Sequence, residues 1–461
     1  MPDTQFFSAL KTIVGEDRVL TDPGDCLPYG YDNSRMQAIP DAVVFPTEEP
    51  QIKELVRLCN EHNTPLVARG KGTGTTGATV PTQGGVVLSL ERMNRIIEVD
   101  PDNRYIRVQP GVTNQEVQEA AGAHGFFWPP DPTSATICTV GGNLAYNSAG
   151  PRAVKYGTPR ENTLGLRAVT GNGQLIETGV RTTKGVVGLD LTRLLIGSEG
   201  KLAIITEATL KLPPLAEDKK TLRAFYRDMH SAAQAVSAIM AQSVMPCALE
   251  FLDGAALDMI RDKPELEIPD EAHGLLMIEV DGSAACLDDS ARAVASAARN
   301  DGCLELEIAA SKEEVQRLWQ MRKALSPTLR KVAPKKINED VVVPVSHIPD
   351  LISGLGDLSE KHKTKIVNFG HAGNGNIHVN LLTNPDDPVQ MERAEACLDE
   401  VFDLVLSLNG SLSGEHGIGL AKRDYVSREI GLESLRLMHQ IKQVFDPLNI
   451  LNPGKQLPPL D

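Results

Sequence analysis

The chain has 461 residues, more than one hydrophobic core supports, so we expect two domains. Hydrophobic residues make up 41% and charged residues 23%, an ordinary globular composition that excludes a largely disordered chain. The net charge of −15 is spread along the chain, so the surface repels phosphate backbones and nucleic acid is not an expected partner.

The N-terminus and the cysteines indicate the cellular location. No basic region followed by an apolar run begins the chain, and no run reaches the ~18 apolar residues that span a bilayer. The seven cysteines are widely spaced without a C-x-x-C pair, which predicts reduced thiols. We expect a cytoplasmic protein with no transmembrane segment; peripheral association with the inner membrane is the alternative.

The first third of the chain predicts an α/β unit followed by a hairpin. A helix beginning near Thr47 carries apolar residues at helical spacing, and turn-forming side chains at 100–103 join two short strands. The expected strands are 42–45, 65–68, 96–99 and 105–108. A helix rich in Gln and Ala should follow to about Ala123.

Residues 125–163 are dominated by Gly, Pro, Asn, Ser and Thr, which predicts a long irregular segment of the kind that is usually functional. A second hairpin should turn at 171–173, and a strand at 203–206 leads to Pro213 and Pro214. We place a domain boundary there.

Beyond that boundary, strand-like and helical runs alternate, which predicts a small sheet covered by helices. The expected strands are 222–225, 248–251, 275–278 and 304–307, and the expected helices are 231–241, 284–299 and 312–332. The fold class is therefore α+β: a lead segment at 1–38, a first domain at 39–214 and a second domain at 215–461 with an antiparallel sheet under helices.

The loop at 72–77 matches the letters G-x-G-x-x-G but not the structure that this motif requires. A dinucleotide-binding loop opens a helix, whereas Pro81, Gly84 and Gly85 lead here into another strand. An NAD enzyme is excluded on that ground. Because four glycines at 70, 72, 74 and 77 allow backbone amides to converge, we expect this loop to bind a diphosphate.

Five motifs together resemble the flavoprotein family of vanillyl-alcohol oxidase and p-cresol methylhydroxylase (PCMH). They are 40–46, 69–77, 130–134, 141–150 and Gly197-Ser198-Glu199-Gly200. Two further motifs, 370–380 and 413–419, resemble the branch of D-lactate, glycolate and D-2-hydroxyglutarate dehydrogenases. The resemblance covers the chain from about residue 38 and implies a PCMH-type FAD-binding domain followed by a substrate (cap) domain.

The resemblance implies which residues hold FAD. Those expected at the pyrophosphate are Gly70, Gly72, Thr73, Gly74, Thr76 and Gly77, and those at the adenosine and flavin are Pro132, Ser134, Gly141, Gly142, Ser148 and Gly150. Ile205 should meet the ring through its backbone. The set is completed by Arg69, Lys71, Thr133, Asn147, Tyr156, Glu199, Ile204 and Asn452. Since the loop has no His, Tyr or Cys, we expect FAD to bind non-covalently.

A metal site is predicted at two glycine-rich motifs. The segment 365–380 reads as strand, turn and strand, which can bring His371 and His378 together and places His378 and Asn380 on one face. Glu415 lies in Ser413-Gly414-Glu415-His416-Gly417, where the flanking glycines permit close approach, and it could supply a third ligand. Two His and one carboxylate with an open position favour a divalent metal, zinc first, with manganese or iron as alternatives. The alternative is that these histidines form hydrogen bonds within the interior.

The resemblance also implies a mechanism. His416 is in the family's base position and should accept the hydroxyl proton while a hydride passes to flavin N5. Arg322 matches the carboxylate-binding arginine, with a solvated helix face as the alternative, and Ser326, Asn380 and Lys336 complete the expected substrate set. Asn338 stands where the D-2-hydroxyglutarate enzymes have lysine, which favours a shorter acid.

We therefore expect an FAD-dependent D-2-hydroxy-acid dehydrogenase, acting first on D-lactate. D-2-hydroxyglutarate dehydrogenase or a glycolate oxidase FAD subunit are the alternatives. An FAD-binding electron-transfer subunit without its own substrate chemistry is the alternative of a different class. The expected partners are the small substrate and a non-NAD electron acceptor, which could be a quinone, a cytochrome or an electron-transfer flavoprotein. A homodimer is one of the assemblies that the sequence allows.

Overall fold

The computed structural model describes residues 4–263, 266–311, 313–319, 328 and 333–460. The chain forms two compact units. Unit 1 comprises Met1–Gly150, Gly157–Leu215 and Glu415–Asp461, and unit 2 comprises Pro151–Tyr156 and Ala216–Gly414. The two-domain α+β class is confirmed. Apart from the short excursion at 151–156, the chain passes from unit 1 to unit 2 after Leu215, next to the boundary expected at 214. It returns to unit 1 at Glu415.

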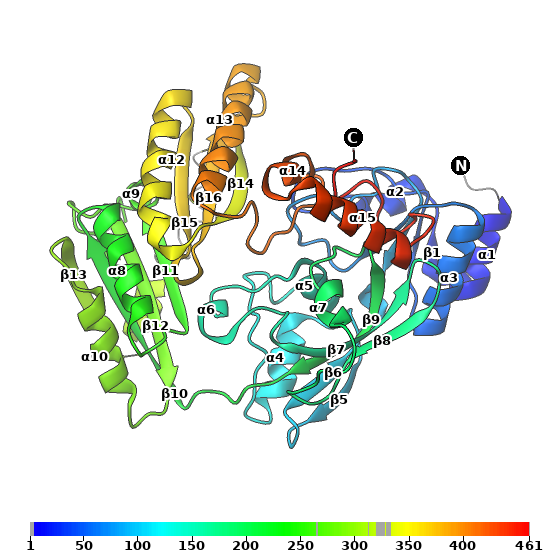
Figure 1. Ribbon diagram of the computed structural model, residues 1–461, viewed down its shortest axis with the longest axis horizontal. Helices are drawn as coiled ribbons and strands as arrows, with labels where there is room; N and C mark the ends of the chain where they lie inside the picture. Colours follow the sequence, from blue (N-terminus) through cyan, green and yellow to red (C-terminus); the bar gives the residue numbers. More distant parts are fainter. Residues whose placement is uncertain (1–3, 264–265, 312, 320–327, 329–332, 461) are drawn as a thin grey trace. The chain divides into compact units, whose positions relative to one another are not determined.

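Unit 1 contains two sheets (Figure 1). The four-stranded sheet has the order β1 (Val19–Leu20), β2 (Ala42–Val44), β4 (Val86–Ser89) and β3 (Leu66–Arg69). The five-stranded antiparallel sheet has the order β5 (Ile96–Asp100), β6 (Tyr105–Val108), β9 (Ala203–Lys211), β7 (Thr163–Thr170) and β8 (Leu175–Gly179). Its helices are α1 (Thr4–Val14), α2 (Pro23–Cys26), α3 (Glu49–Glu61), α4 (Asn114–Gly122), α5 (Val140–Tyr146), α7 (Leu191–Leu195), α14 (Val426–Glu429) and α15 (Leu432–Phe445).

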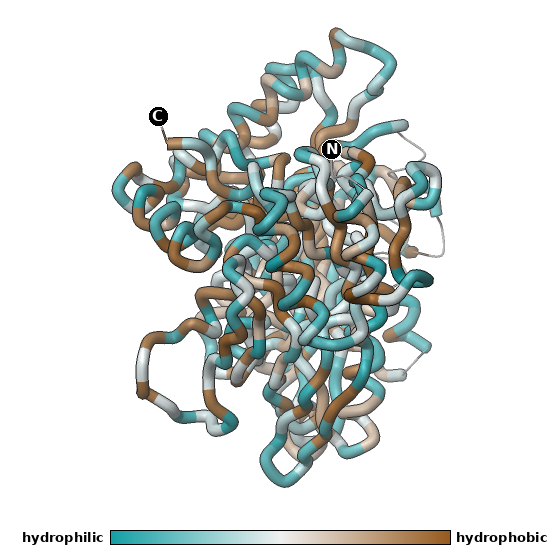
Figure 2. Tube along the Cα trace, turned by 90° about the vertical axis from the view of Figure 1, so that its right-hand side faces the viewer, coloured by the Kyte–Doolittle hydropathy of each residue, from teal (hydrophilic) through white to brown (hydrophobic). Residues whose placement is uncertain are grey.

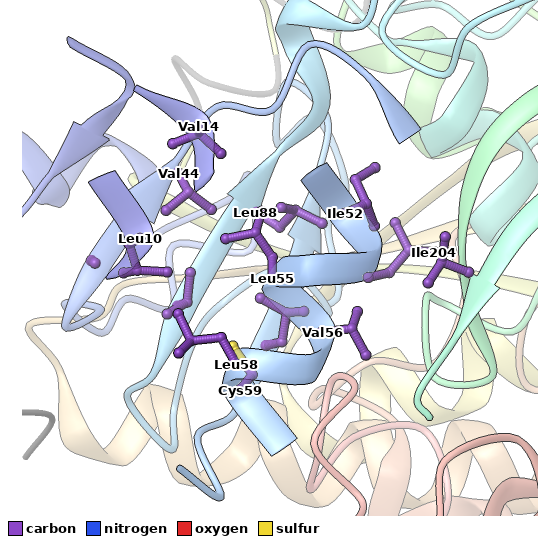
Figure 3. Close-up of a cluster of buried hydrophobic side chains, with 14 of the residues drawn as sticks. Leu10, Val14, Val44, Ile52, Leu55, Val56, Leu58, Cys59, Leu88 and Ile204 are labelled. Atoms are coloured by element: carbon purple, nitrogen blue, oxygen red, sulfur yellow. The ribbon is translucent and has the colours of Figure 1, made fainter. Parts of the chain in front are cut away.

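The core of the four-stranded sheet is built from helices with one apolar face. Leu10 and Val14 of α1 and Leu55 of α3 recur at helical spacing and point toward Val44 and Leu88 on the parallel strands (Figure 3). All five are at most 3% exposed. Each such side chain stabilises the fold by about 1.5–3 kcal/mol through burial, so this packing fixes β4, the strand to which the glycine loop leads.

Unit 2 is built on one seven-stranded antiparallel sheet. Its order is β13 (Cys303–Ile308), β10 (Asp218–Tyr226), β12 (Gly274–Gly282), β11 (Ala248–Asp253), β15 (Lys365–His371), β16 (Asn376–Thr383) and β14 (Lys335–Val342). Its helices are α6 (Ala153–Tyr156), α8 (Met229–Ala241), α9 (Gly254–Asp258), α10 (Leu287–Ala298), α12 (Ile348–His362) and α13 (Pro388–Ser407). Figure 1 shows α8, α10, α12 and α13 packed against this sheet. The expected sheet covered by helices is confirmed, and of these four helices α8 and α10 match expected ranges.

Two segments differ from their predicted structure or extend beyond the described residues. The stretch expected to be irregular at 125–163 contains α5, because the Thr139 side chain accepts a hydrogen bond from Gly142 N and caps a short helix that periodicity does not reveal. Of the helix expected at 312–332, residues 313–319 are helical and most of the remainder lies outside the described residues.

Hydrophobic and hydrophilic residues interchange over short stretches along the chain (Figure 2). Among the described residues, no helix has the length and apolarity that crossing a membrane requires.

Candidate functional site

A cavity in unit 1 lies between the glycine loop, α5 and the beginning of β9. Arg69 and Gly70 line it from the loop side, and Ile204 and Ile205 line it from β9. It encloses about 620 Å³ of atom-free space, part of which is open to solvent. The two isoleucines give this cavity an apolar wall suited to a flat ring.

The glycine loop approaches α5 closely at this cavity. A Cβ atom at Gly70 would lie 2.4 Å from Oγ1 of Thr139, the residue that caps α5, so a side chain at position 70 would push the loop away. No helix follows the loop, and the next element is β4, which confirms that this is not a dinucleotide-binding turn of the NAD type. The loop and the capped helix thus form a tight cradle.

Residues of the N-terminal lead segment form hydrogen bonds with the glycine loop and with Arg69, which precedes it. The Asp32 carboxylate accepts a hydrogen bond of 2.9 Å from the Gly77 amide. The Arg69 guanidinium donates to the carbonyls of Tyr31 (2.6 Å) and Pro28 (3.3 Å). Burial raises the pKa of Asp32. Arg69 therefore shapes the cradle through backbone contacts as well as lining it.

Glu199 connects the cavity wall to the C-terminal segment of unit 1. Its carboxylate accepts hydrogen bonds from the amides of Ile418 (2.6 Å) and Gly419 (2.9 Å), and its carbonyl accepts one from Asn452 Nδ2 (2.7 Å). Burial raises the pKa of Glu199. Thr76 Oγ1, in the glycine loop, donates to the His416 carbonyl at 3.4 Å. These contacts tie the backbone around His416 to the walls of the cavity.

Glu415 is held by the loop that follows α5. Its carboxylate accepts hydrogen bonds from the amides of Ala149 (3.2 Å) and Gly150 (2.7 Å), and its carbonyl accepts one from Ser148 Oγ (3.3 Å). Two backbone donors stabilise the ionised carboxylate and orient it. Ser148 and Gly150, expected at FAD, thus contact Glu415 and do not line the cavity.

The seven-stranded sheet of unit 2 has one face on which polar side chains gather. Cross-strand partners point to the same side, and register pairs His378 with both Phe369 and Asp340. His371 lies two residues beyond Phe369, so it shares that face. The rings of His371 and His378 are 5.3 Å apart between centroids, as the predicted hairpin requires.

Glu250 on β11 supports His371. The two residues are register partners on neighbouring strands, and the Glu250 carboxylate shares a hydrogen bond with Nδ1 of His371. Both side chains are buried, at 2% and 9% exposed. A carboxylate at Nδ1 fixes the ring orientation and leaves the Nε2 lone pair for a ligand, as in carboxylate–histidine–metal arrangements.

The segment 411–414 runs along the free edge of β14 and presents the residue that follows it. The Gly414 amide donates to the carbonyl and the carboxylate of Asp340, both at 2.9 Å. Glu415 is the next residue. One ligand atom from each of His371, His378 and Glu415 lies within 4.8 Å of the other two.

These three residues fit a divalent cation by the chemistry of their donors. Two imidazoles and a carboxylate are a common set for zinc, manganese or iron(II), and they leave positions open for substrate oxygens. Glu250 supplies the supporting carboxylate that such sites use.

The predicted substrate residues lie on the same face of the sheet. Asn338 Nδ2 donates to Oδ1 of Asn380 at 2.8 Å, and Lys336 Nζ lies 3.5 Å from the same atom. Asn380 Nδ2 donates to the carbonyls of Val367 (3.1 Å) and His378 (3.0 Å). Arg322 and Ser326 lie outside the described residues.

The remaining predicted FAD residues divide into two groups. Gly141, Gly142, Glu199, Ile204 and Ile205 line the cavity with Arg69 and Gly70. Three others form contacts away from this cavity. Lys71 forms an ion pair with Glu91 (2.7 Å), Tyr156 donates to Asp281 within unit 2 (2.8 Å), and Asn147 accepts from Thr158 (3.0 Å). Gly72, Thr73, Gly74, Thr76, Gly77, Pro132, Thr133, Ser134 and Asn452 are not among the lining residues.

Sequence reasoning missed several residues of these sites. Asp32, Tyr146 and Thr139 support or line the cavity, and Glu250 and Asp340 support the histidine cluster. Glu250 carries a signal that could have been used, because it is a carboxylate between the apolar residues Leu249 and Phe251 of a strand.

Two family models match different parts of the chain. The description "FAD binding domain" matches residues 40–179, and "FAD linked oxidases, C-terminal domain" matches residues 215–456. The glycolate oxidase subunit GlcD of Bacillus subtilis is 40% identical over 430 residues, covering 93% of this chain and 92% of that protein. A D-lactate dehydrogenase of Archaeoglobus fulgidus is 36% identical over 439 residues, covering 93% and 95%.

Solved structures show the same fold at low identity. p-Cresol methylhydroxylase superposes with a TM-score of 0.79 at 19% identity, covering 98% of this chain and 96% of that one. Since two domain models cover most of the chain and relatives exceed 35% identity over nearly all of it, the family is shown. The chain belongs to the FAD-linked oxidases and is an FAD-dependent oxidoreductase of the branch that contains glycolate oxidase subunits and D-lactate dehydrogenases.

Proposed function

We propose that this protein oxidises a D-2-hydroxy acid, D-lactate in the first place, to the 2-oxo acid, with His416 as the base. The observation that carries the proposal is the cluster of His371, His378 and Glu415, followed in the chain by His416. Relatives named as D-lactate dehydrogenase and glycolate oxidase subunit support the substrate class.

Different groups of residues would bind the two cofactors. The cavity residues would hold FAD, and His371, His378 and Glu415 would hold a divalent cation, zinc first. When bound, these groups supply a hydride acceptor and polarisation of the substrate's hydroxyl and carboxylate oxygens. His416 accepts the hydroxyl proton, because an imidazole nitrogen can act as a general base.

The substrate carboxylate would be oriented by the polar residues beside His378. Lys336 offers a positive charge, and Asn380 is fixed by its hydrogen bonds to two backbone carbonyls. Asn338, in contact with Asn380, supplies an amide where a second carboxylate would need a cation, which favours a short monocarboxylate such as D-lactate. D-2-hydroxyglutarate and glycolate are the alternatives that a substrate panel would distinguish.

The base is tested with His416→Ala. We expect the variant to retain FAD absorbance but to lose anaerobic reduction of the flavin by D-lactate, by about 10²-fold or more, because removing a general base costs 10²–10⁴. His124→Ala, at an exposed position of unit 1, is the control for a lost imidazole. Stopped-flow bleaching at 450 nm is the measurement, and wild-type rates in His416→Ala would remove this residue from the mechanism.

The metal is tested by chelation. Dialysis against dipicolinate should lower both the metal content and the rate of flavin reduction, and added Zn²⁺ or Mn²⁺ should restore the rate. Full activity in protein shown by elemental analysis to be metal-free would reject a metal role.

A second candidate is an FAD-binding electron-transfer subunit, which the word "subunit" in the name of the Bacillus relative favours. The purified chain alone should be bleached anaerobically by D-lactate if it carries its own substrate chemistry. Bleaching that appears only with a partner subunit would favour the second candidate.

A further inference from the structure

A second cavity of unit 1, separate from the one lined by the glycine loop, carries an excess of positive charge. It lies between α15, the turn before β9 and the C-terminal tail, and it encloses about 1,320 Å³ of space, part of it open to solvent. Lys201, Arg423, Arg436 and Lys442 line it, and Asp446 is its carboxylate. Four cations against one carboxylate is unusual in a chain of net charge −15.

Lys201 is the central observation. The residue is 5% exposed, and its side chain lines this cavity. Within the part of the chain that the structure describes, its ammonium has no hydrogen bond and no ion pair. Burial, together with Lys442 close by, lowers the pKa of Lys201 to about 8, so the group is charged at neutral pH. The side chain is thus largely buried while its ammonium faces the cavity without a protein partner, which leaves it available to an anionic ligand.

The Asp446 carboxylate is not the partner of Lys201. It forms an ion pair with Lys442 and accepts hydrogen bonds from backbone amides. Lys442 Nζ forms an ion pair with Asp446 and donates to the carbonyls of Lys201 (2.7 Å) and Leu451 (2.9 Å). Asp446 also accepts hydrogen bonds from the amides of Ile450 (3.2 Å) and Leu451 (2.7 Å). Lys442 and Asp446 thus bind each other and the backbone, and both line the cavity together with Lys201.

Two arginines complete the cavity from different elements. Arg436 and His439 share one face of α15 at i, i+3 spacing. Arg423 is placed by a hydrogen bond of 2.7 Å from its Nη1 to the Gly454 carbonyl. The ion pairs of Arg423 with Asp424 and of Arg436 with Glu433 involve carboxylates that are 75% and 83% exposed, so they restrain the guanidinium groups little.

We propose that this cavity binds a small multivalent oxyanion, a phosphate or a polycarboxylate, with Lys201 at its centre. Guanidinium forks and an ammonium are the donors that such anions prefer. The site is distinct from the proposed FAD cavity, since the two have no lining residue in common: Ser198, Glu199 and Gly200 line one, and Lys201 lines the other.

The proposal is tested by calorimetry on the FAD-loaded protein at pH 7. Inorganic phosphate and citrate are titrated separately, with NaCl keeping the ionic strength constant so that general screening cancels. We expect saturable binding of at least one of them. Binding of phosphate alone would identify a phosphoryl ligand, and binding of citrate alone would identify a polycarboxylate.

Variants assign the binding to this cavity. Lys201→Met should weaken binding at least tenfold, and Arg436→Gln, at an exposed position, should weaken it about threefold. Lys184→Gln, in a fully exposed loop, is the matched control and should bind as wild type does. If Lys201→Met does not fold, an Arg436→Gln/His439→Gln double variant replaces it. Absence of saturable binding by both anions, or wild-type affinity in the cavity variants, would overturn the proposal.

Discussion

At the scale of single residues, Glu250 illustrates how a buried carboxylate is used in this fold. It lies 121 positions from His371 in the sequence, yet it shares a hydrogen bond with that ring. Ionised groups are rarely buried without a partner, so its place in an apolar strand is explained by the histidine that it orients.

Replacing Glu250 by Gln should loosen the cluster. An amide holds the His371 ring less firmly and removes the charge that makes it a better ligand, so we expect Zn²⁺ affinity to fall 10- to 100-fold. Competition with a chromophoric chelator measures this. Glu395→Gln, on the exposed side of α13, is the control; equal affinities in the two variants would show that Glu250 does not act on the site.

Asp253 predicts a pH dependence of stability. Its carboxylate accepts hydrogen bonds from the amides of Ala256 (2.7 Å) and Asn368 (2.9 Å), yet burial raises its pKa from 3.8 to about 6. Because the folded protein holds this proton more tightly than the unfolded chain, the contribution to stability is complete below pH 3.8 and is lost as pH rises through 6.

The free energy of unfolding of wild type, minus that of Asp253→Asn, should therefore decrease by ~3 kcal/mol from pH 3.5 to pH 7. Urea titrations at each pH measure it. Asp301→Asn, at an exposed position of the same unit, is the control variant and should lack this decrease. A flat difference for Asp253→Asn as well would contradict the assignment of the buried proton.

At the scale of elements, the β15–β16 hairpin depends on one glycine in its turn. Gly375 has φ +72°, and a Cβ atom there would lie 1.8 Å from the Val343 carbonyl oxygen. Its own carbonyl accepts a hydrogen bond of 3.0 Å from the Val343 amide. The turn thus joins the two histidine-bearing strands while packing directly on the chain that leaves β14.

We expect Gly375→Ala to lower the free energy of unfolding by about 2–4 kcal/mol, through backbone strain and the clash with Val343, and to reduce the bound metal. Gly356→Ala is the control, since a Cβ atom there meets nothing within 4 Å in the middle of α12. That change should stabilise by up to about 1 kcal/mol. Chemical denaturation measures both, and a neutral Gly375→Ala would show that the turn adapts.

The hairpin and α5 show what can be predicted for a single element. The hairpin follows from local rules, because alternating residues on either side of a glycine turn specify both strands and their register. Helix α5 does not, because Gly141, Gly142 and Asn143 are weak helix formers and the helix depends on the Thr139 cap and on packing. Tertiary contacts outweigh propensity there.

At the scale of the whole molecule, FAD is expected to be dissociable. The described lining of the first cavity contains neither His nor Cys, and burial raises the pKa of the Tyr146 hydroxyl, which keeps that group neutral. Acid precipitation should release all the yellow colour into the supernatant, measured by absorbance. Colour that stays with the precipitated protein would reveal a covalent link.

Features that depend on neighbours along the chain were predictable from the amino-acid sequence: two domains, a glycine loop that opens no helix, and a hairpin that brings His371 near His378. Only the tertiary structure decided which distant groups meet, such as Asp32 with Gly77, Glu199 with Ile418, and the cations that surround Lys201. The reason is physical. Periodicity and turn chemistry act over a few residues, whereas a buried charge takes its partner from whichever segment the packing of the core brings beside it.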